Sequence, residues 1–260
     1  MRQERNTPCS EGADGDNRFA MTDALDIDGI AIAYRHAPGS GPAVVFLPGY
    51  MSDMAGGKAT AVFDRSTAQG RECLLLDYSG CGESEGDFAD GTLSRWRDEV
   101  VALIEAKVEN ESVIITGSSM GGWLMLLVGL ALGERLAGLV GIASAPDFSE
   151  WGFDAAQKAK LSAGETIYEE SDYGYDPMPT HAAFWRDAES LKMLDNGIAI
   201  TCPVRLLHGQ DDDDVPSDIS LRLAGALNSE DVQVTLVKGG DHRLSRESDI
   251  ALLLRTVASF

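Results

Sequence analysis

The sequence predicts a protein of the α/β class, with a mostly parallel twisted sheet and helices on both of its faces. Short, nearly continuous apolar runs recur along the chain and end in small or polar residues, as expected of parallel strands buried on both faces. Stretches with apolar residues at helical spacing alternate with these runs. With 260 residues, 44% of them hydrophobic, the chain is long enough for one large core.

The first predicted elements are a tail and a hairpin. We expect residues 1 to 20 to form a mobile polar tail and residues 21–260 to form a single domain. At the start of this domain, Asp28 and Gly29 stand between two alternating apolar segments in ALDIDGIAIAYRHA. An Asp-Gly pair in that setting indicates a tight antiparallel hairpin.

The parallel strands and the helices follow in alternation. The predicted strands are AVVFLPG, ECLLLDYSG, SVIITGSS, LVGIASAP, PVRLLHG and VQVTLVKGG. The predicted helices are ATAVFDRSTAQ, TLSRWRDEVVALIEAKV, MGGWLMLLVGLALG, SDISLRLAGALN and ESDIALLLRTVASF. Thr92 is placed to cap the second of these helices.

One segment, from about 147 to 192, interrupts the alternation and predicts short helices rich in aromatic residues. We expect it to form a cap over the carboxyl ends of the strands, where open α/β sheets bind ligands. The candidate substrate-binding residues are Trp151, Phe153, Phe184 and Trp185. The alternative is that these side chains are only the core of the cap.

Charge and composition limit the partners of the protein. A net charge of −21 repels nucleic-acid phosphates and anionic lipids, so we expect no nucleic acid partner. The most apolar run, Trp123 to Leu132, is too short to span a membrane and predicts a buried helix. The four cysteines show no pairing pattern, and the amino terminus resembles neither a signal nor a transit peptide. We therefore expect a cytoplasmic protein with reduced thiols.

The strongest chemical motif is G-x-S-x-G, formed by Gly117, Ser119 and Gly121 with the residues between them. An apolar strand leads into the motif and an apolar helix leads out of it, which is the context of a nucleophile elbow. The two glycines allow the close backbone approach that such a strained turn requires. Ser119 is therefore the candidate nucleophile, and the alternative is a glycine-rich turn that opens a helix.

A serine nucleophile needs a histidine base and a carboxylate that orients it. The chain has four histidines, of which His36 lies in the hairpin, His181 in the cap and His208 at a strand end. His242 follows the last strand, on the same sheet edge as the elbow, and is the candidate base. The candidate acid is one of the four aspartates 211 to 214. The order serine, acid, histidine is that of α/β-hydrolases.

Two backbone N–H groups are candidates for the oxyanion hole. The group of Tyr50 follows the first parallel strand in LPGY, and that of Met120 follows the nucleophile. A further glycine-rich turn, DYSGCGES, comes after the next strand, and we interpret it as structural support for the site.

The sequence matches none of the common cofactor-binding motifs. In GGKAT, Ser52 and Ala59 occupy positions where a phosphate-binding loop needs glycine and Ser or Thr. The GCGESEG stretch lacks dinucleotide spacing, and no cluster has zinc or EF-hand spacing. We expect no cofactor and no bound metal.

Several motifs together resemble a known family. LPGYMSDMAGGKA, LDYSGCGESEGDF, ITGSSMGGWLML, CPVRLLHGQDDDDVP and DHRLSRESDIALLL are similar to the α/β-hydrolases related to abhydrolase domain-containing protein 10. The resemblance implies an α/β-hydrolase fold and an acyl-protein thioesterase or acyl-glucuronide esterase activity. It places the nucleophile on Ser119, the base on His242 and the acid on Asp212, with Asp211 the second candidate. Because like charges hinder one another's ionisation, we expect the pKa of this acid to be raised.

The expected function is a serine hydrolase that cleaves acyl esters or thioesters through an acyl-enzyme on Ser119. A small-molecule acyl ester or thioester, or an acylated protein, is the expected partner. The nearest alternative is a general carboxylesterase or lipase-like hydrolase, and a more distant one is a binding module that has the fold without the chemistry.

Overall fold

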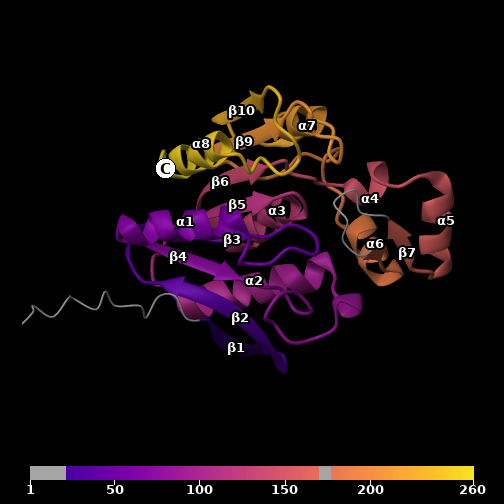
Figure 1. The fold of residues 1–260 in the computed structure, drawn as a ribbon, viewed down its shortest axis with the longest axis horizontal. Helices are drawn as coiled ribbons and strands as arrows, with labels where there is room; N and C mark the ends of the chain where they lie inside the picture. Colours follow the sequence, from indigo (N-terminus) through magenta and orange to yellow (C-terminus); the bar gives the residue numbers. More distant parts are fainter. Residues whose placement is uncertain (1–21, 170–176) are drawn as a thin grey trace, which may run out of the picture.

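The computed structural model describes residues 22–169 and 177–260. The predicted tail, residues 1 to 20, lies outside the described residues. The family of folds expected from the sequence is confirmed: a central, mostly parallel sheet is flanked by helices and entered through an antiparallel hairpin (Figure 1).

The central sheet has eight strands, in the order β1-β2-β4-β3-β5-β6-β9-β10. Their bounds are β1 (Asp23–Ile27), β2 (Ile30–Ala37), β3 (Ser40–Leu47), β4 (Arg71–Leu76), β5 (Val113–Ser118), β6 (Leu136–Ile142), β9 (Val204–Gly209) and β10 (Val232–Val237). Strand β2 is antiparallel to both β1 and β4, and all pairs from β4 to β10 are parallel.

The predicted hairpin joins β1 to β2 through a two-residue turn. Ile27 pairs with Ile30, and both residues between them have positive φ, 52° at Asp28 and 82° at Gly29. A two-residue turn with two positive φ angles has the twist that neighbouring strands require. The Asp-Gly pair therefore sets the register of the first two strands.

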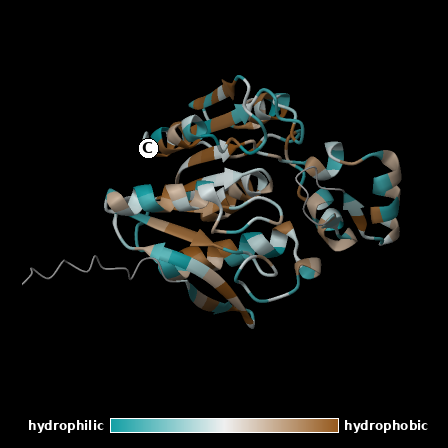
Figure 2. Ribbon diagram, in the orientation of Figure 1, coloured by the Kyte–Doolittle hydropathy of each residue, from teal (hydrophilic) through white to brown (hydrophobic). Residues whose placement is uncertain are grey.

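Helices cover both faces of the sheet. Helices α1 (Gly57–Ala68) and α8 (Glu247–Val257) pack on one face. Helices α2 (Leu93–Lys107), α3 (Met120–Leu132) and α7 (Asp218–Ala226) pack on the other. Two short 3₁₀ turns, η2 (Phe88–Asp90) and η3 (Gly133–Arg135), complete this body. The hydrophobic residues of the strands lie between these two layers (Figure 2).

Local signals explain two of these helices. Thr92 accepts a hydrogen bond from the Arg95 N–H at 3.2 Å and so caps α2, as its position in the sequence predicts. The apolar run that begins at Trp123 lies within α3, where nearly every residue is buried. No described helix is both long enough and apolar enough to cross a membrane.

Between β6 and β9 the chain forms a group of short elements beside the body, at the right of Figure 1. They are α4 (Phe148–Trp151), α5 (Ala155–Ala163), β7 (Ile167–Glu169), β8 (Met178–Thr180) and α6 (Ala182–Ser190). We refer to residues 148–190 as the cap. The antiparallel pair β7–β8 is an addition to the short helices that the sequence predicts, and its two strands are only three residues long.

Candidate active site

The candidate nucleophile, Ser119, lies at the junction of β5 and α3. Its backbone has φ 55° and ψ −119°, a strained combination for a residue with a side chain. A Cβ atom on Gly121 would lie 2.2 Å from the carbonyl oxygen of Leu47, and one on Gly117 would lie 2.2 Å from that of Gly121. Gly121 is therefore required by the close approach of the elbow to the end of β3, and Gly117 by the close approach of β5 to the first turn of α3.

The structure brings the candidate base and acid to this serine. His242 Nε2 lies 3.0 Å from Ser119 Oγ, and His242 Nδ1 lies 2.9 Å from Asp212 Oδ2. Asp212 is in the loop after β9 and His242 is in the loop after β10. Three separate loops at the carboxyl ends of parallel strands thus build one continuous hydrogen-bonded series.

The hydrogen-bond partners determine the histidine tautomer. An ionised carboxylate can only accept hydrogen bonds, so the proton of neutral His242 lies on Nδ1, facing Asp212. His242 Nε2 then carries a free lone pair and accepts the hydrogen bond of the Ser119 hydroxyl. This arrangement can take the proton of Ser119 when the hydroxyl attacks a carbonyl carbon.

The expectation that neighbouring aspartates raise the pKa of Asp212 is wrong. The side chain is fully buried, which by itself would raise the pKa, but hydrogen bonds from His208 and His242 and from the Val215 N–H hold it well below its ordinary value of 3.8. The N–H groups of Asp214 and Val215 both donate to Asp212 Oδ1, at 3.0 and 2.8 Å. The residues that follow Asp212 thus donate backbone hydrogen bonds that favour its ionised carboxylate. The side chain of Asp211 is exposed to solvent.

The candidate oxyanion residues lie on the two loops that meet at Ser119. A Cβ atom on Gly49 would lie 3.4 Å from the Cβ atom of Ser119, which places the β3 loop directly against the nucleophile. The N–H of Tyr50 is next in that loop, and the N–H of Met120 opens α3. Within residues 22–169 and 177–260, neither N–H donates to a protein oxygen, so both are available for a ligand.

The sequence did not single out two residues that brace the Tyr50 loop, although they lie in the DYSGCGES turn. The buried carboxylate of Asp77 accepts hydrogen bonds from the N–H groups of Met54, at 2.7 Å, and Glu83, at 2.8 Å. The hydroxyl of Tyr78 donates to the carbonyl oxygen of Pro48 at 3.0 Å. The turn after β4 therefore holds the loop of the candidate oxyanion residue in place.

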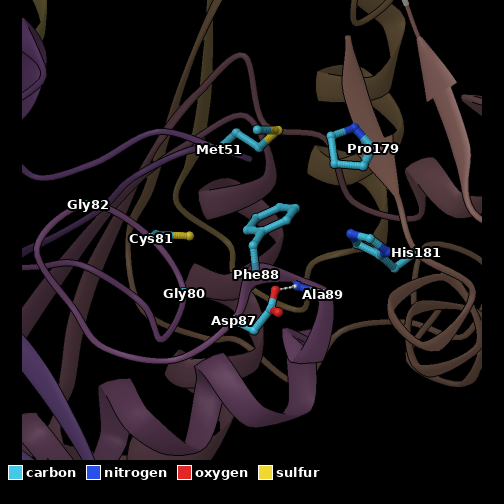
Figure 3. A pocket seen from close by; sticks show the side chains of 9 residues that line it. All are labelled: Met51, Gly80, Cys81, Gly82, Asp87, Phe88, Ala89, Pro179 and His181. Atoms are coloured by element: carbon cyan, nitrogen blue, oxygen red, sulfur yellow. Dashed lines mark hydrogen bonds between the residues drawn. The ribbon is translucent and has the colours of Figure 1, made fainter. Parts of the chain in front are cut away.

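A cavity of about 420 Å³ lies beside the Tyr50 loop, between that loop, η2 and the cap strand β8 (Figure 3). Its lining is mostly apolar and consists of Met51, Gly80, Cys81, Gly82, Asp87, Phe88, Ala89, Pro179 and His181. Tyr50 adjoins this lining, since its ring lies 5.1 Å from that of Phe88 and its hydroxyl donates to the Pro179 carbonyl at 2.9 Å. The cavity volume is typical of a small-molecule site.

None of the four candidate substrate-binding residues lines this cavity. Phe184 is buried against the Tyr50 ring, with 5.1 Å between the ring centroids. Phe153 and Trp185 pack within the cap, and Trp151 packs against the body near Ala145. For Phe153 and Trp185 this packing favours the alternative that they form the core of the cap.

One group of side chains has the spacing of metal ligands. Within the described residues, ligand atoms of Asp212, Asp214 and His242 lie within 4.8 Å of one another. Asp212 and His242 already bond to each other and to Ser119 through His242, so we assign both to this series and not to a cation.

The fold defines the class of protein, the α/β-hydrolases, and the candidate residues have the arrangement that serine hydrolases of this fold use. The chain belongs to the alpha/beta hydrolase family, whose model matches residues 44–254. It is therefore a hydrolase, and the resemblance that the motifs indicate is confirmed.

Two sequence relatives and one solved structure are similar to this chain. It is 38% identical over 232 residues to mouse "Palmitoyl-protein thioesterase ABHD10, mitochondrial", covering 87% of this chain and 77% of the relative. The human protein of the same name is 35% identical over 235 residues, covering 87% and 75%. The solved structure of mouse alpha/beta hydrolase domain-containing protein 10 superposes with a TM-score of 0.84 at 36% identity, covering 92% of this chain and 97% of that one.

These relatives correct one expectation. Both are named as mitochondrial, so the prediction of a cytoplasmic protein is wrong and the similarity points to a mitochondrial location. Free thiols and the composition of the amino terminus did not discriminate between the two compartments.

Proposed function

We propose that the protein is a serine thioesterase that removes long-chain acyl groups from thiols through an acyl-enzyme on Ser119. The observation that supports this most strongly is the hydrogen-bonded series from Ser119 through His242 to Asp212, with distances of 3.0 and 2.9 Å. The named activity of the mouse and human relatives, palmitoyl-protein thioesterase, supports the substrate class.

The proposed reaction has two steps. The Ser119 oxygen attacks the thioester carbonyl carbon while His242 Nε2 takes the hydroxyl proton, and the N–H groups of Tyr50 and Met120 stabilise the negative carbonyl oxygen. When the carbon–sulfur bond breaks, His242 returns the proton to the thiolate. Water then attacks the acyl-enzyme in the same way and releases the fatty acid.

A neutral acyl substrate fits the charges of the cap better than an acyl glucuronide does. Lys192 pairs with Glu150 and Glu189 at 3.4 and 3.2 Å, and the Lys158 ammonium donates to the Glu150 carbonyl. Lys192 and Lys158 are therefore already engaged by neighbouring groups and are poorly placed to receive a glucuronate carboxylate.

The test is a panel of substrates for the purified protein: palmitoyl and acetyl thioesters, p-nitrophenyl esters from C2 to C16, and an acyl glucuronide. We expect the long-chain thioester to have the highest kcat/KM and the S119A variant to lose roughly 10⁶-fold in kcat. A preference for acetyl substrates would indicate a general carboxylesterase instead, and undiminished hydrolysis by S119A would overturn the mechanism.

A further inference from the structure

The buried histidine next to the candidate acid has no part in the reaction proposed above. His208 is the penultimate residue of β9, and its side chain is completely buried. A buried imidazole requires a partner for each ring nitrogen. The partners of His208 come from the loop after β9 and from α7, and all of them lie within four to twelve residues along the chain.

The partners determine where the proton of His208 lies. His208 Nε2 is 2.9 Å from the Val215 carbonyl oxygen and 3.2 Å from Asp212 Oδ2. Both oxygens can only accept, so Nε2 carries the hydrogen. His208 Nδ1 is then an acceptor, and the Ser220 hydroxyl donates to it at 2.7 Å.

These contacts close a ring around the candidate acid. Asp212 Oδ1 accepts the Val215 N–H, while the carbonyl oxygen of the same Val215 accepts from His208. The other carboxylate oxygen, Oδ2, faces His208 and is also the oxygen nearest to His242 Nδ1. His208 therefore donates a hydrogen bond to the turn that carries Asp212 and lies against the oxygen that His242 contacts.

We propose that His208 is a positioning residue that fixes the Asp212 carboxylate in the orientation required by His242. The inference rests on the proposed function, because it takes Asp212 and His242 as the acid and base for Ser119. The lowered pKa of Asp212 agrees with it: burial alone would raise that pKa, and hydrogen bonds from His208 and His242 outweigh the effect of burial.

Two conservative substitutions test the contacts of the two ring nitrogens of His208 separately: Nε2 faces Asp212, and Nδ1 faces Ser220. The amide of glutamine reaches as far as Nε2, so His208→Gln keeps a donor for Val215 and Asp212. The amide of asparagine reaches only as far as Nδ1, so His208→Asn keeps a partner for Ser220 and loses that donor. We expect His208→Asn to lower kcat by up to about 100-fold with little change in KM, and His208→Gln to restore most of it.

The matched control is His36→Asn. His36 makes a comparable pair with a carboxylate, at 2.9 Å from Glu72, but it lies in the hairpin strand β2. Urea unfolding identifies variants that have lost stability, and we expect kcat of His36→Asn to equal that of the wild type.

Nuclear magnetic resonance supplies readouts that do not need turnover. The imidazole ¹⁵N shifts of the wild type should report the Nε2–H tautomer of His208, and the His242 Nδ1 proton signal should move in His208→Asn. The proposal would be overturned by the opposite tautomer of His208 or by a folded His208→Asn variant with wild-type kcat. Equal losses of kcat in His208→Asn and His208→Gln would also overturn it. If the wild type cleaved no acyl substrate, the proposed function would fail, while the His242 proton signal would still decide the positioning role.

Discussion

At the scale of single residues, the four consecutive aspartates differ through their surroundings. Asp212 is enclosed by His208, His242 and two backbone N–H groups, whereas the side chains of Asp211, Asp213 and Asp214 are not buried. Of these four identical side chains, only that of Asp212 is buried in the candidate site. The sequence predicts that the acid lies among these four residues. The position of Asp212 in the loop after β9 brings its side chain to His242.

The first prediction compares two of these aspartates. Asp212→Asn removes the charge that stabilises the imidazolium of His242 and permits the wrong tautomer, so we expect kcat to fall by roughly 10⁴. Asp211→Asn changes an exposed carboxylate and should leave kcat close to that of the wild type. Steady-state hydrolysis of an activated ester by both purified variants measures this, and a larger loss for Asp211→Asn would show that the acid is misassigned.

The second prediction concerns stability in acid. Because the folded state holds the pKa of Asp212 below its ordinary value of 3.8, ionised Asp212 stabilises the fold above that value. This contribution is lost as the pH falls from about 4 towards the lower pKa of the folded protein. We therefore expect the free energy of unfolding to fall more steeply with decreasing pH in the wild type than in Asp212→Asn. Equal slopes in urea titrations between pH 5 and pH 2 would contradict the lowered pKa.

At the scale of elements, the elbow depends on how closely α3 approaches the β3 loop. A methyl group on Gly121 would meet the backbone oxygens of Leu47 and Pro48 at 2.2 and 2.4 Å. Backbone atoms cannot rotate away as a flexible side chain can, so accommodating this group requires the two loops to separate. The loop that carries Tyr50 and the turn that carries Ser119 would then lose their relative placement.

The third prediction follows from this contact. We expect Gly121→Ala to lower the free energy of unfolding by about 1–3 kcal/mol and to reduce kcat. Gly57→Ala is the matched control, because a methyl group at this first residue of α1 meets nothing within 4 Å. Urea unfolding should show it unchanged or slightly more stable. Equal behaviour of the two variants would contradict the close approach.

The fourth prediction tests the cavity beside the Tyr50 loop. Ala89 lines this cavity, so Ala89→Phe fills part of it with a ring. If the acyl chain occupies the cavity, kcat/KM for the C16 ester should fall more than that for the C2 ester, which serves as the internal control. An equal effect on both esters would place the acyl chain elsewhere.

The elements also show how far the sequence predicts the structure. Buried parallel strands and amphipathic helices have periodic patterns, and the Asp28-Gly29 turn has a local signal, so these elements were predicted. The pair β7–β8 has three-residue strands without a readable period. The contacts of His208 with Val215 and Ser220 and those of Asp77 with Met54 and Glu83 depend on how irregular loops fold back on their strands, which no periodic pattern in the sequence encodes.

At the scale of the whole molecule, the site exists only when the sheet is assembled. Ser119 and His242 are 123 residues apart in the sequence, and Asp212 and His242 are 30 apart. They meet because β5, β9 and β10 are parallel strands of one sheet and end at the same edge. The long insertion between β6 and β9 lies beside this edge, as Figure 1 shows. The topology of the sheet therefore brings the three candidate residues together.

We propose that the assembled site activates Ser119 as a nucleophile. Its most direct test is the intact mass of the folded protein after reaction with a fluorophosphonate, followed by peptide mapping. We predict one adduct on Ser119 in the wild type and none in S119A. A folded wild-type protein that remains unlabelled, or an adduct on a different residue, would contradict it.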